Sequence, residues 1–212
     1  MKKLNVGSGN DIKPKKEGWT NLDLHKRLGA DIIFDLNDIY KEKKMPFKDG
    51  EFDYILCSHV LEDFIDPIPI MDELVRITKP GGILEIRVPY ETCTWDGIFH
   101  KRPFNIKTFF MYVNRGDYEK EKMPIRVKKA RFYTPRVTLR GFIWSPITTP
   151  LTLFFVNLFN ILIKIKYDFV DKSILKLLAQ GTVYIRLKYE KLESPLKDER
   201  SLWDKIIFRL KR

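Results

Sequence analysis

The sequence predicts an α/β fold, with a doubly wound and mostly parallel sheet of seven strands and a helical insertion between the last two strands. Two observations predict it. Five short apolar segments alternate with polar or helical ones over residues 1–111, which suits a parallel sheet covered on both faces. Two further segments that alternate apolar and basic residues follow, far apart in the chain.

The five apolar segments of the first half each lead into a polar or glycine-containing turn. We expect strands at residues 3–6, 19–24, 30–34, 52–58 and 83–89. Residues 67–78 predict a helix, because their apolar side chains share one stripe and the Pro-Gly-Gly sequence at 80–82 stops it. Asp72 and Glu73 would lie near the start of this helix, where its dipole favours acidic side chains.

The second half predicts the last two strands at residues 125–133 and 182–189. The chain between them is too long for a structureless loop, so we expect an insertion with helices of its own. This division gives a core over 1–135 and an apolar helical insertion over 136–180. The last core strand and a basic amphipathic C-terminal helix make up 181–212.

The formal charge of +11 is segregated along the chain. Residues 1–111 hold 17 Lys and Arg against 18 Asp and Glu, so the entire positive excess belongs to the second half. A segregated excess indicates that this half meets an anionic partner, such as a membrane surface, nucleic acid or an acidic substrate.

Cysteine and histidine spacing argues against redox and metal chemistry. Cys57 and Cys93 form no CxxC pair, which favours reduced thiols in a cytoplasmic protein. The three histidines are far apart and lack the spacing of zinc ligands, so we expect no metal site.

A glycine-rich turn at residues 7–9 follows the first expected strand. Alone, this turn is weak evidence for nucleotide binding, because glycine also occurs in ordinary turns that require a positive φ. Two carboxylates strengthen it: Asp23 ends the second strand, placed to accept from ribose hydroxyls, and Asp35 ends the third, placed to accept from an adenine amino group. Without a Walker lysine, the pattern fits a nucleoside better than a nucleotide.

The chain contains, in order, LNVGSGN, WTNLDL, ADIIFDL, MPFKDGEFDYILCSHVLEDF and DELVRITKPGGILEIRVPY. These five motifs cover residues 3–110 and resemble those of class I S-adenosylmethionine-dependent methyltransferases, closest to the small type 11 family. The resemblance implies a Rossmann-like fold, an enzyme, and S-adenosyl-L-methionine as its cofactor.

The resemblance also implies which residues hold the cofactor. The glycines would let the backbone approach its methionine part, Asp23 would hold the ribose, and Asp35 with Leu36 the adenine edge. The implied cofactor-binding residues are Asn5, Val6, Gly7, Gly9, Asp23, Leu24, Asp35, Leu36, Cys57, Ser58 and His59.

Three positions depart from the resembled pattern. Asn5 stands where the family usually has Asp or Glu, so it brings no charge to the cofactor ammonium, although its side chain can still accept a hydrogen bond. Asp11 stands where a third small residue is usual. Asp63 replaces the histidine that usually follows the Leu-Glu pair, and we attach no catalytic role to it.

Methyl transfer from a sulfonium asks mainly for alignment, which can supply roughly 7–11 kcal/mol. A general base is needed only if the acceptor is a hydroxyl or a protonated amine. His100 is the candidate catalytic base, because it follows the fifth strand in a run that resembles the substrate-side wall of the family. The alternative is that His100 only orients this loop.

An uncharged stretch of 23 residues, 141–163, falls in the expected insertion. It is open to three readings: a lid over the acceptor pocket, a patch that docks on a membrane or takes a lipidic substrate, and a membrane span. Pro146 and Pro150 count against the span. The basic helix expected at 201–212 fits an interfacial anchor, or a helix packed on the domain or on a second copy.

The sequence therefore predicts methyl transfer to a small-molecule acceptor or to a lipid- or glycan-linked one. The protein would be cytoplasmic, with peripheral membrane contact through 141–163 and 201–212 as one option, and its oligomeric state is open. An RNA or protein methyltransferase that docks its substrate on the basic half is the second hypothesis, although no RNA-binding module is recognisable. A non-catalytic cofactor-binding scaffold is the third.

Overall fold

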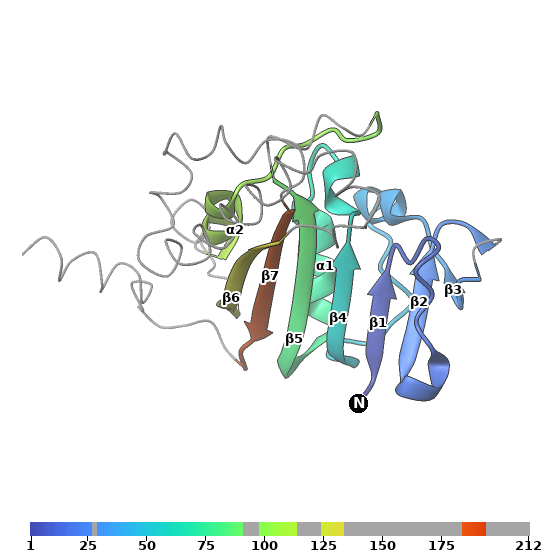
Figure 1. The fold of residues 1–212 in the computed structure, drawn as a ribbon. Coiled ribbons are helices and arrows are strands. Elements are labelled where there is room, and N and C mark those ends of the chain that lie inside the picture. Colours follow the sequence, from blue (N-terminus) through green and yellow to red (C-terminus); the bar gives the residue numbers. More distant parts are fainter. Residues whose placement is uncertain (27–28, 91–97, 114–123, 134–183, 194–212) are drawn as a thin grey trace, which may run out of the picture.

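The computed structural model describes residues 1–26, 29–90, 98–113, 124–133 and 184–193. These residues form a seven-stranded sheet with the order β3-β2-β1-β4-β5-β7-β6 (Figure 1). The strands are Lys3–Val6 (β1), Trp19–Asp23 (β2), Ile32–Ile33 (β3), Phe52–Ser58 (β4), Thr78–Pro89 (β5), Ile125–Tyr133 (β6) and Tyr184–Lys191 (β7). The predicted Rossmann-like α/β fold with a mostly parallel sheet of seven strands is confirmed.

Strands β1 to β5 run parallel to their neighbours, whereas β7 is antiparallel to both β5 and β6. The carboxyl ends of β1 and β4 therefore lie side by side at the upper edge of the sheet in Figure 1. In an open sheet of this kind, ligands bind outside the carboxyl ends of the strands.

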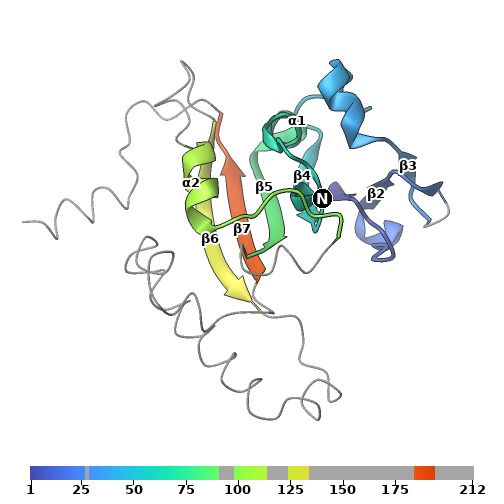
Figure 2. The same ribbon diagram turned by 90° about the horizontal axis from the view of Figure 1, so that it is seen from above.

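Two α-helices, Ile68–Ile77 (α1) and Ile106–Val113 (α2), lie on the same side of the sheet (Figure 2). The apolar stripe of α1 is buried in the core against β4 and β5 residues such as Ile55 and Ile86. Neither described helix is long and apolar enough to span a membrane. The predicted insertion over 136–180 and the predicted C-terminal helix over 201–212 lie outside the described residues.

The start of β5 differs from the prediction of a turn before a strand at 83–89. Thr78 already pairs with Phe52, and Ile83 pairs with Tyr54, so the chain between Thr78 and Ile83 bulges opposite a single residue of β4. Gly82 allows this bulge, because a Cβ there would lie 2.8 Å from a backbone oxygen. The helix thus passes directly into a bulged strand.

The centre of the sheet holds a fully buried carboxylate, that of Glu85 in β5. It accepts a hydrogen bond from the Tyr54 hydroxyl of β4, and its oxygens lie 2.6 Å from Arg87 and 2.9 Å from the Lys188 ammonium of β7. A buried charge is stable only when it is paired and hydrogen-bonded. Glu85 therefore links the parallel part of the sheet to the antiparallel strand β7.

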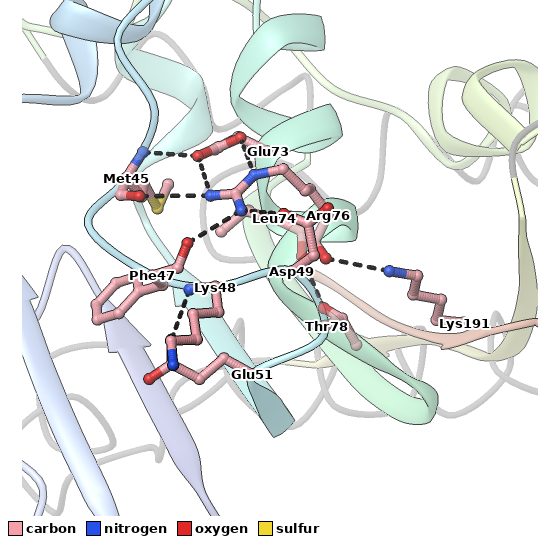
Figure 3. A network of polar contacts seen from close by, with 10 residues as sticks. All are labelled: Met45, Phe47, Lys48, Asp49, Glu51, Glu73, Leu74, Arg76, Thr78 and Lys191. Carbon is pink, nitrogen blue, oxygen red and sulfur yellow. Dashed lines mark hydrogen bonds and ion pairs between the residues drawn. The ribbon is translucent and has the colours of Figure 1, made fainter.

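A second buried carboxylate, Glu73 in α1, organises the loop before β4 (Figure 3). It pairs with Arg76 through two contacts of 2.6 and 2.7 Å and accepts from the Met45 backbone N–H at 2.6 Å. Arg76 also donates to the Phe47 carbonyl at 3.0 Å. The prediction that Glu73 and Asp72 lie near the helix start is wrong, because α1 has no acidic residue in its first turn.

We expect Glu73→Ala to lower the free energy of unfolding by about 3 kcal/mol, because Arg76 and the Met45 N–H would lose a buried partner. Chemical denaturation measures this change. Asp49→Ala is the matched control: Asp49 contacts the same guanidinium but is 81% exposed, so its loss should cost less than about 1 kcal/mol. Equal losses in the two variants would contradict the assignment.

Candidate functional site

The turn after β1 is shaped by two glycines in the left-handed region, Gly7 with φ +63° and Gly9 with φ +50°. The backbone N–H of Ser8 between them donates to the Leu22 carbonyl of β2 at 3.1 Å. An added Cβ at Gly9 would meet nothing within 4 Å, so the turn presents its backbone to open space. These conformations are natural for glycine and costly for other residues.

Gly7 also lets the turn approach the loop after β4. A Cβ at this position would lie 2.3 Å from Val60 Cγ2, closer than any real contact between carbon atoms. Val60 therefore packs directly on the backbone of the glycine turn. The contact fixes the carboxyl ends of β1 and β4 against each other.

Asp23, at the carboxyl end of β2, faces the glycine turn. Its Oδ2 accepts from the Gly9 N–H at 2.8 Å, and its Oδ1 accepts from the His25 N–H at 3.0 Å. The side chain is buried, yet each carboxylate oxygen can accept a second hydrogen bond. Leu24 beside it is 49% exposed, an apolar side chain at the rim of the turn.

Asn5 lies beneath the glycine turn instead of facing outward. Its buried amide donates to the Asp11 carbonyl at 2.8 Å and to Asn21 Oδ1 at 3.1 Å. These two hydrogen bonds use only its NH₂ group, so the acceptance of a hydrogen bond by Asn5 Oδ1 stays a prediction. Asp11 points away and pairs with Lys13 at 2.6 Å.

The remaining predicted cofactor residues differ in whether their side chains are accessible. Asp35 caps the 3-10 helix Leu36–Lys41 (η3), where its Oδ1 accepts from the Asn37 N–H at 2.9 Å. Ser58 is half-buried, whereas Val6, Leu36 and Cys57 have buried side chains and can reach a ligand only through their backbone. Burial, and secondarily the Glu62 carboxylate, raises the pKa of the Cys57 thiol, so it stays protonated.

A polar cluster lies just past β4, where the 3-10 helix Leu61–Asp63 (η4) begins. His59 is left-handed with φ +56°, and its Nδ1 lies 3.2 Å from Glu62 Oε1. His100, the predicted catalytic base, has its Nε2 4.0 Å from the same oxygen. The two histidines are thus brought together by Glu62, a residue that sequence reasoning missed.

Asp63 completes this cluster. Burial raises the pKa of its carboxyl, and the neighbouring Glu62 carboxylate adds to the effect, whereas His100, Lys101 and His59 oppose it. One carboxyl oxygen of Asp63 is buried and has no hydrogen-bond partner among the described residues. Asp63 is therefore easier to ionise in the unfolded chain than in the folded protein.

An apolar cavity of about 340 Å³ lies between α1, α2 and the loop before α2. Its lining includes Leu61, Met71, Phe104 and Phe109, with Arg102 as a charged member. This volume is within the range of small-molecule sites. Leu61 is the chain neighbour of Glu62, so the cavity begins next to the polar cluster.

The described residues fit an adenosyl sulfonium cofactor. The left-handed turn is open at Gly9, and Ser8 Oγ is buried without a hydrogen-bond partner in the described part of the chain. Asp23 would hold a ribose, and the exposed Leu24 offers an apolar surface beside it. No cluster of His, Cys, Asp and Glu within the described ranges is arranged to hold a metal ion.

Comparison with known proteins finds similarity to methyltransferases over part of the chain. Residues 15–86 match the family model described as a methyltransferase domain. An uncharacterized methyltransferase of Schizosaccharomyces pombe is 41% identical over 59 residues, which are 28% of this chain and 20% of that protein. The demethylmenaquinone methyltransferase of Staphylococcus saprophyticus is 28% identical over 109 residues, covering 40% of this chain and 46% of that protein. The chain thus spans less than half the length of these curated relatives.

Solved structures share the fold. A SAM-dependent methyltransferase from Methanosarcina mazei superposes with a TM-score of 0.53 at 13% identity, over 90% of this chain and 92% of that one. One from Archaeoglobus fulgidus gives 0.52 at 13% identity, over 90% and 86%.

We expect Gly7→Ala to lower the free energy of unfolding by about 1–3 kcal/mol, because the methyl group meets the stiff Val60 side chain and φ stays positive. Thermal and chemical denaturation measure the loss. Gly9→Ala isolates the backbone strain, because nothing surrounds that position. If the contact is the cause, adding Val60→Ala to Gly7→Ala restores part of the stability; no recovery would contradict it.

We expect Asp63→Asn to stabilise the protein increasingly as pH rises. A folded pKa above the unfolded value, about 3.8, gives a stability contribution that is complete below pH 3.8 and is lost as pH rises through the folded pKa. Urea denaturation from pH 3.5 to 8 measures the difference. Asp49→Asn should show the opposite trend, because Arg76 lowers the pKa of Asp49.

The five ordered motifs, the family model and the strand order agree with one another. Over residues 15–86 the chain is similar to the family that this methyltransferase domain defines, and its described strands have the fold of S-adenosylmethionine-dependent methyltransferases.

Proposed function

We propose that this chain transfers the methyl group of S-adenosyl-L-methionine to a small-molecule or lipid-linked acceptor. The observation that carries the proposal is the Gly7–Gly9 turn with the Asp23 carboxylate fixed against it at 2.8 Å. The protein's own contribution is to bind the cofactor, to align the acceptor behind its methyl group and to exclude water.

The apolar cavity beside Leu61 supports a small or apolar acceptor. It is lined by side chains of α1 and α2 and lies one residue from the polar cluster. The acceptor named for the Staphylococcus saprophyticus relative, demethylmenaquinone, is an example of such a molecule. Arg102, the charged residue of the lining, would favour an acceptor with an anionic group at one end.

The described basic residues of the second half give little support to an RNA substrate. Arg126 and Lys128 both lie near Glu190, at 2.7 and 3.7 Å, and Lys188 pairs with Glu85. Phosphate binding depends on basic side chains that can neutralise the nucleic acid backbone. These lysine and arginine side chains already have carboxylate partners.

We expect Asp23→Ala to weaken binding of S-adenosylhomocysteine about 10- to 100-fold, because the carboxylate that would hold the ribose is lost. Isothermal titration calorimetry measures the affinity. Asp53→Ala is the matched control. Asp53 lies at the amino end of β4, away from the carboxyl ends of the strands where the glycine turn lies, and it pairs with Lys79. The control should bind normally. Absence of binding by the wild type would contradict the proposed function.

Transfer of labelled methyl groups to fractionated cell extract identifies the acceptor class. We expect label in the small-molecule or lipid fraction and none with Asp23→Ala. Label confined to RNA or protein would contradict the acceptor that we propose.

A further inference from the structure

The carboxyl end of β4 brings two imidazoles to one carboxylate. The Glu62 side chain is 0% exposed, and its Oε1 lies 3.2 Å from His59 Nδ1 and 4.0 Å from His100 Nε2. Its Oε2 has no hydrogen-bond partner among the described residues. Burying a carboxylate with an unsatisfied oxygen is costly, so its retention beside two histidines suggests a role beyond packing.

The backbone holds both histidines in place. His59 has a left-handed conformation that is uncommon for a residue with a side chain, and its N–H donates to the Arg87 carbonyl of β5 at 2.9 Å. The Glu62 carbonyl accepts from the N–H groups of Lys101 and Arg102 at 2.6 and 3.1 Å, which ties the His100 segment to η4. Backbone strain of this kind gathers at functional sites.

The contact between Glu62 and His59 sets the tautomer of the imidazole. An ionised carboxylate only accepts hydrogen bonds, so a hydrogen bond at this 3.2 Å contact requires the proton on His59 Nδ1. With the proton on Nδ1, Nε2 of a neutral ring is the nitrogen that can accept one. The His59 ring is 44% exposed, so it can meet a ligand.

The backbone of His59 also lies close to the glycine turn. Val60, the chain neighbour of His59, packs on Gly7, where a Cβ would be 2.3 Å away. Among the described residues, Lys101 of the loop also influences the Asp63 carboxyl beside this cluster.

We propose that Glu62 is a positioning residue that holds His59 as the proton acceptor for a hydroxyl group, so that the methylated acceptor is an alcohol or a phenol. The inference rests on the proposed function and narrows its acceptor class. A carboxylate acceptor is already ionised near neutral pH and needs no base, whereas a hydroxyl keeps its proton until it reacts. His100 Nε2 lies 4.0 Å from the same carboxylate oxygen.

The step balances as follows. The hydroxyl oxygen forms a bond to the methyl carbon and displaces the sulfur, which keeps the electron pair of the broken bond. His59 Nε2 takes the hydroxyl proton. The products are a methyl ether, S-adenosylhomocysteine and the His59 imidazolium next to Glu62. The imidazolium then releases the Nε2 proton to solvent.

Nitrogen-15 NMR of the three histidine rings tests the positioning role without cofactor or acceptor. At high pH, where the rings are neutral, we expect His59 to carry its proton on Nδ1 in the wild type. In Glu62→Leu the proton should move to Nε2. Asp63→Asn, the neighbouring carboxyl variant, should leave the tautomer unchanged. A wild-type ring protonated on Nε2, or no change in Glu62→Leu, would overturn the proposal.

Glu62→Gln provides a second, isosteric variant in case Glu62→Leu does not fold. We expect S-adenosylhomocysteine to bind it with wild-type affinity, and methyl transfer to the labelled extract fraction to fall roughly 10- to 100-fold. A merely structural role predicts unchanged transfer in a folded variant, and that result would overturn the proposal. Failure of the wild type to bind S-adenosylhomocysteine would instead overturn the proposed function.

The chemistry of the labelled product tests the acceptor class. A methyl ether resists mild alkali and releases methyl iodide in hot hydriodic acid. We expect the label to behave in this way. Release as methanol in mild alkali would show a methyl ester, and resistance to both treatments would show methyl on carbon or nitrogen; either result would overturn the hydroxyl assignment.

Discussion

The close approach of Gly7 to Val60 is the constraint on which the candidate site depends. Only a glycine permits it, because a Cβ would lie 2.3 Å from the valine side chain. The contact sets the distance between the loop after β1, which carries the turn, and the loop after β4, which carries His59. The turn proposed to bind the cofactor and the loop that carries the proposed proton acceptor are therefore held together by direct packing.

Neutral amides support the turn from below. Asn5 and Asn21 are both buried, and they hydrogen-bond each other and the carbonyls of Asp11 and Lys13. Asp31 accepts from Asn21 in turn, and its hydrogen bonds to Lys15 and Asn21 lower the pKa of its carboxyl although burial acts against them.

Local patterns predicted the strands, the glycine turn and the carboxylate at Asp23, because each depends on a short segment and its period. Side chains whose partners lie far along the chain were not predictable in this way. Glu73 was predicted to interact with the helix dipole, but one of its partners is the Met45 backbone N–H, 28 residues earlier in the chain. No sequence pattern singled out Glu62, because its neighbours His59 and His100 come together only in the folded protein. The bulge at the start of β5 depends on its pairing with β4, so the Pro-Gly-Gly sequence alone suggested an ordinary turn.

The place of β7 has a consequence for biosynthesis. It is the last described strand in the chain, yet it lies between β5 and β6, and its Tyr189 is fully buried. A growing polypeptide on the ribosome therefore carries the finished half of β1 to β5 with one open edge until residues 184–191 emerge. Pairing of β5 with β7 requires contact between segments about 100 residues apart, which is slow. Until this pairing forms, the unpaired edge of β5 can pair wrongly with strands of other chains. The described sheet is thus completed only when residues 184–191 have emerged, and until then β5 lacks its antiparallel neighbour.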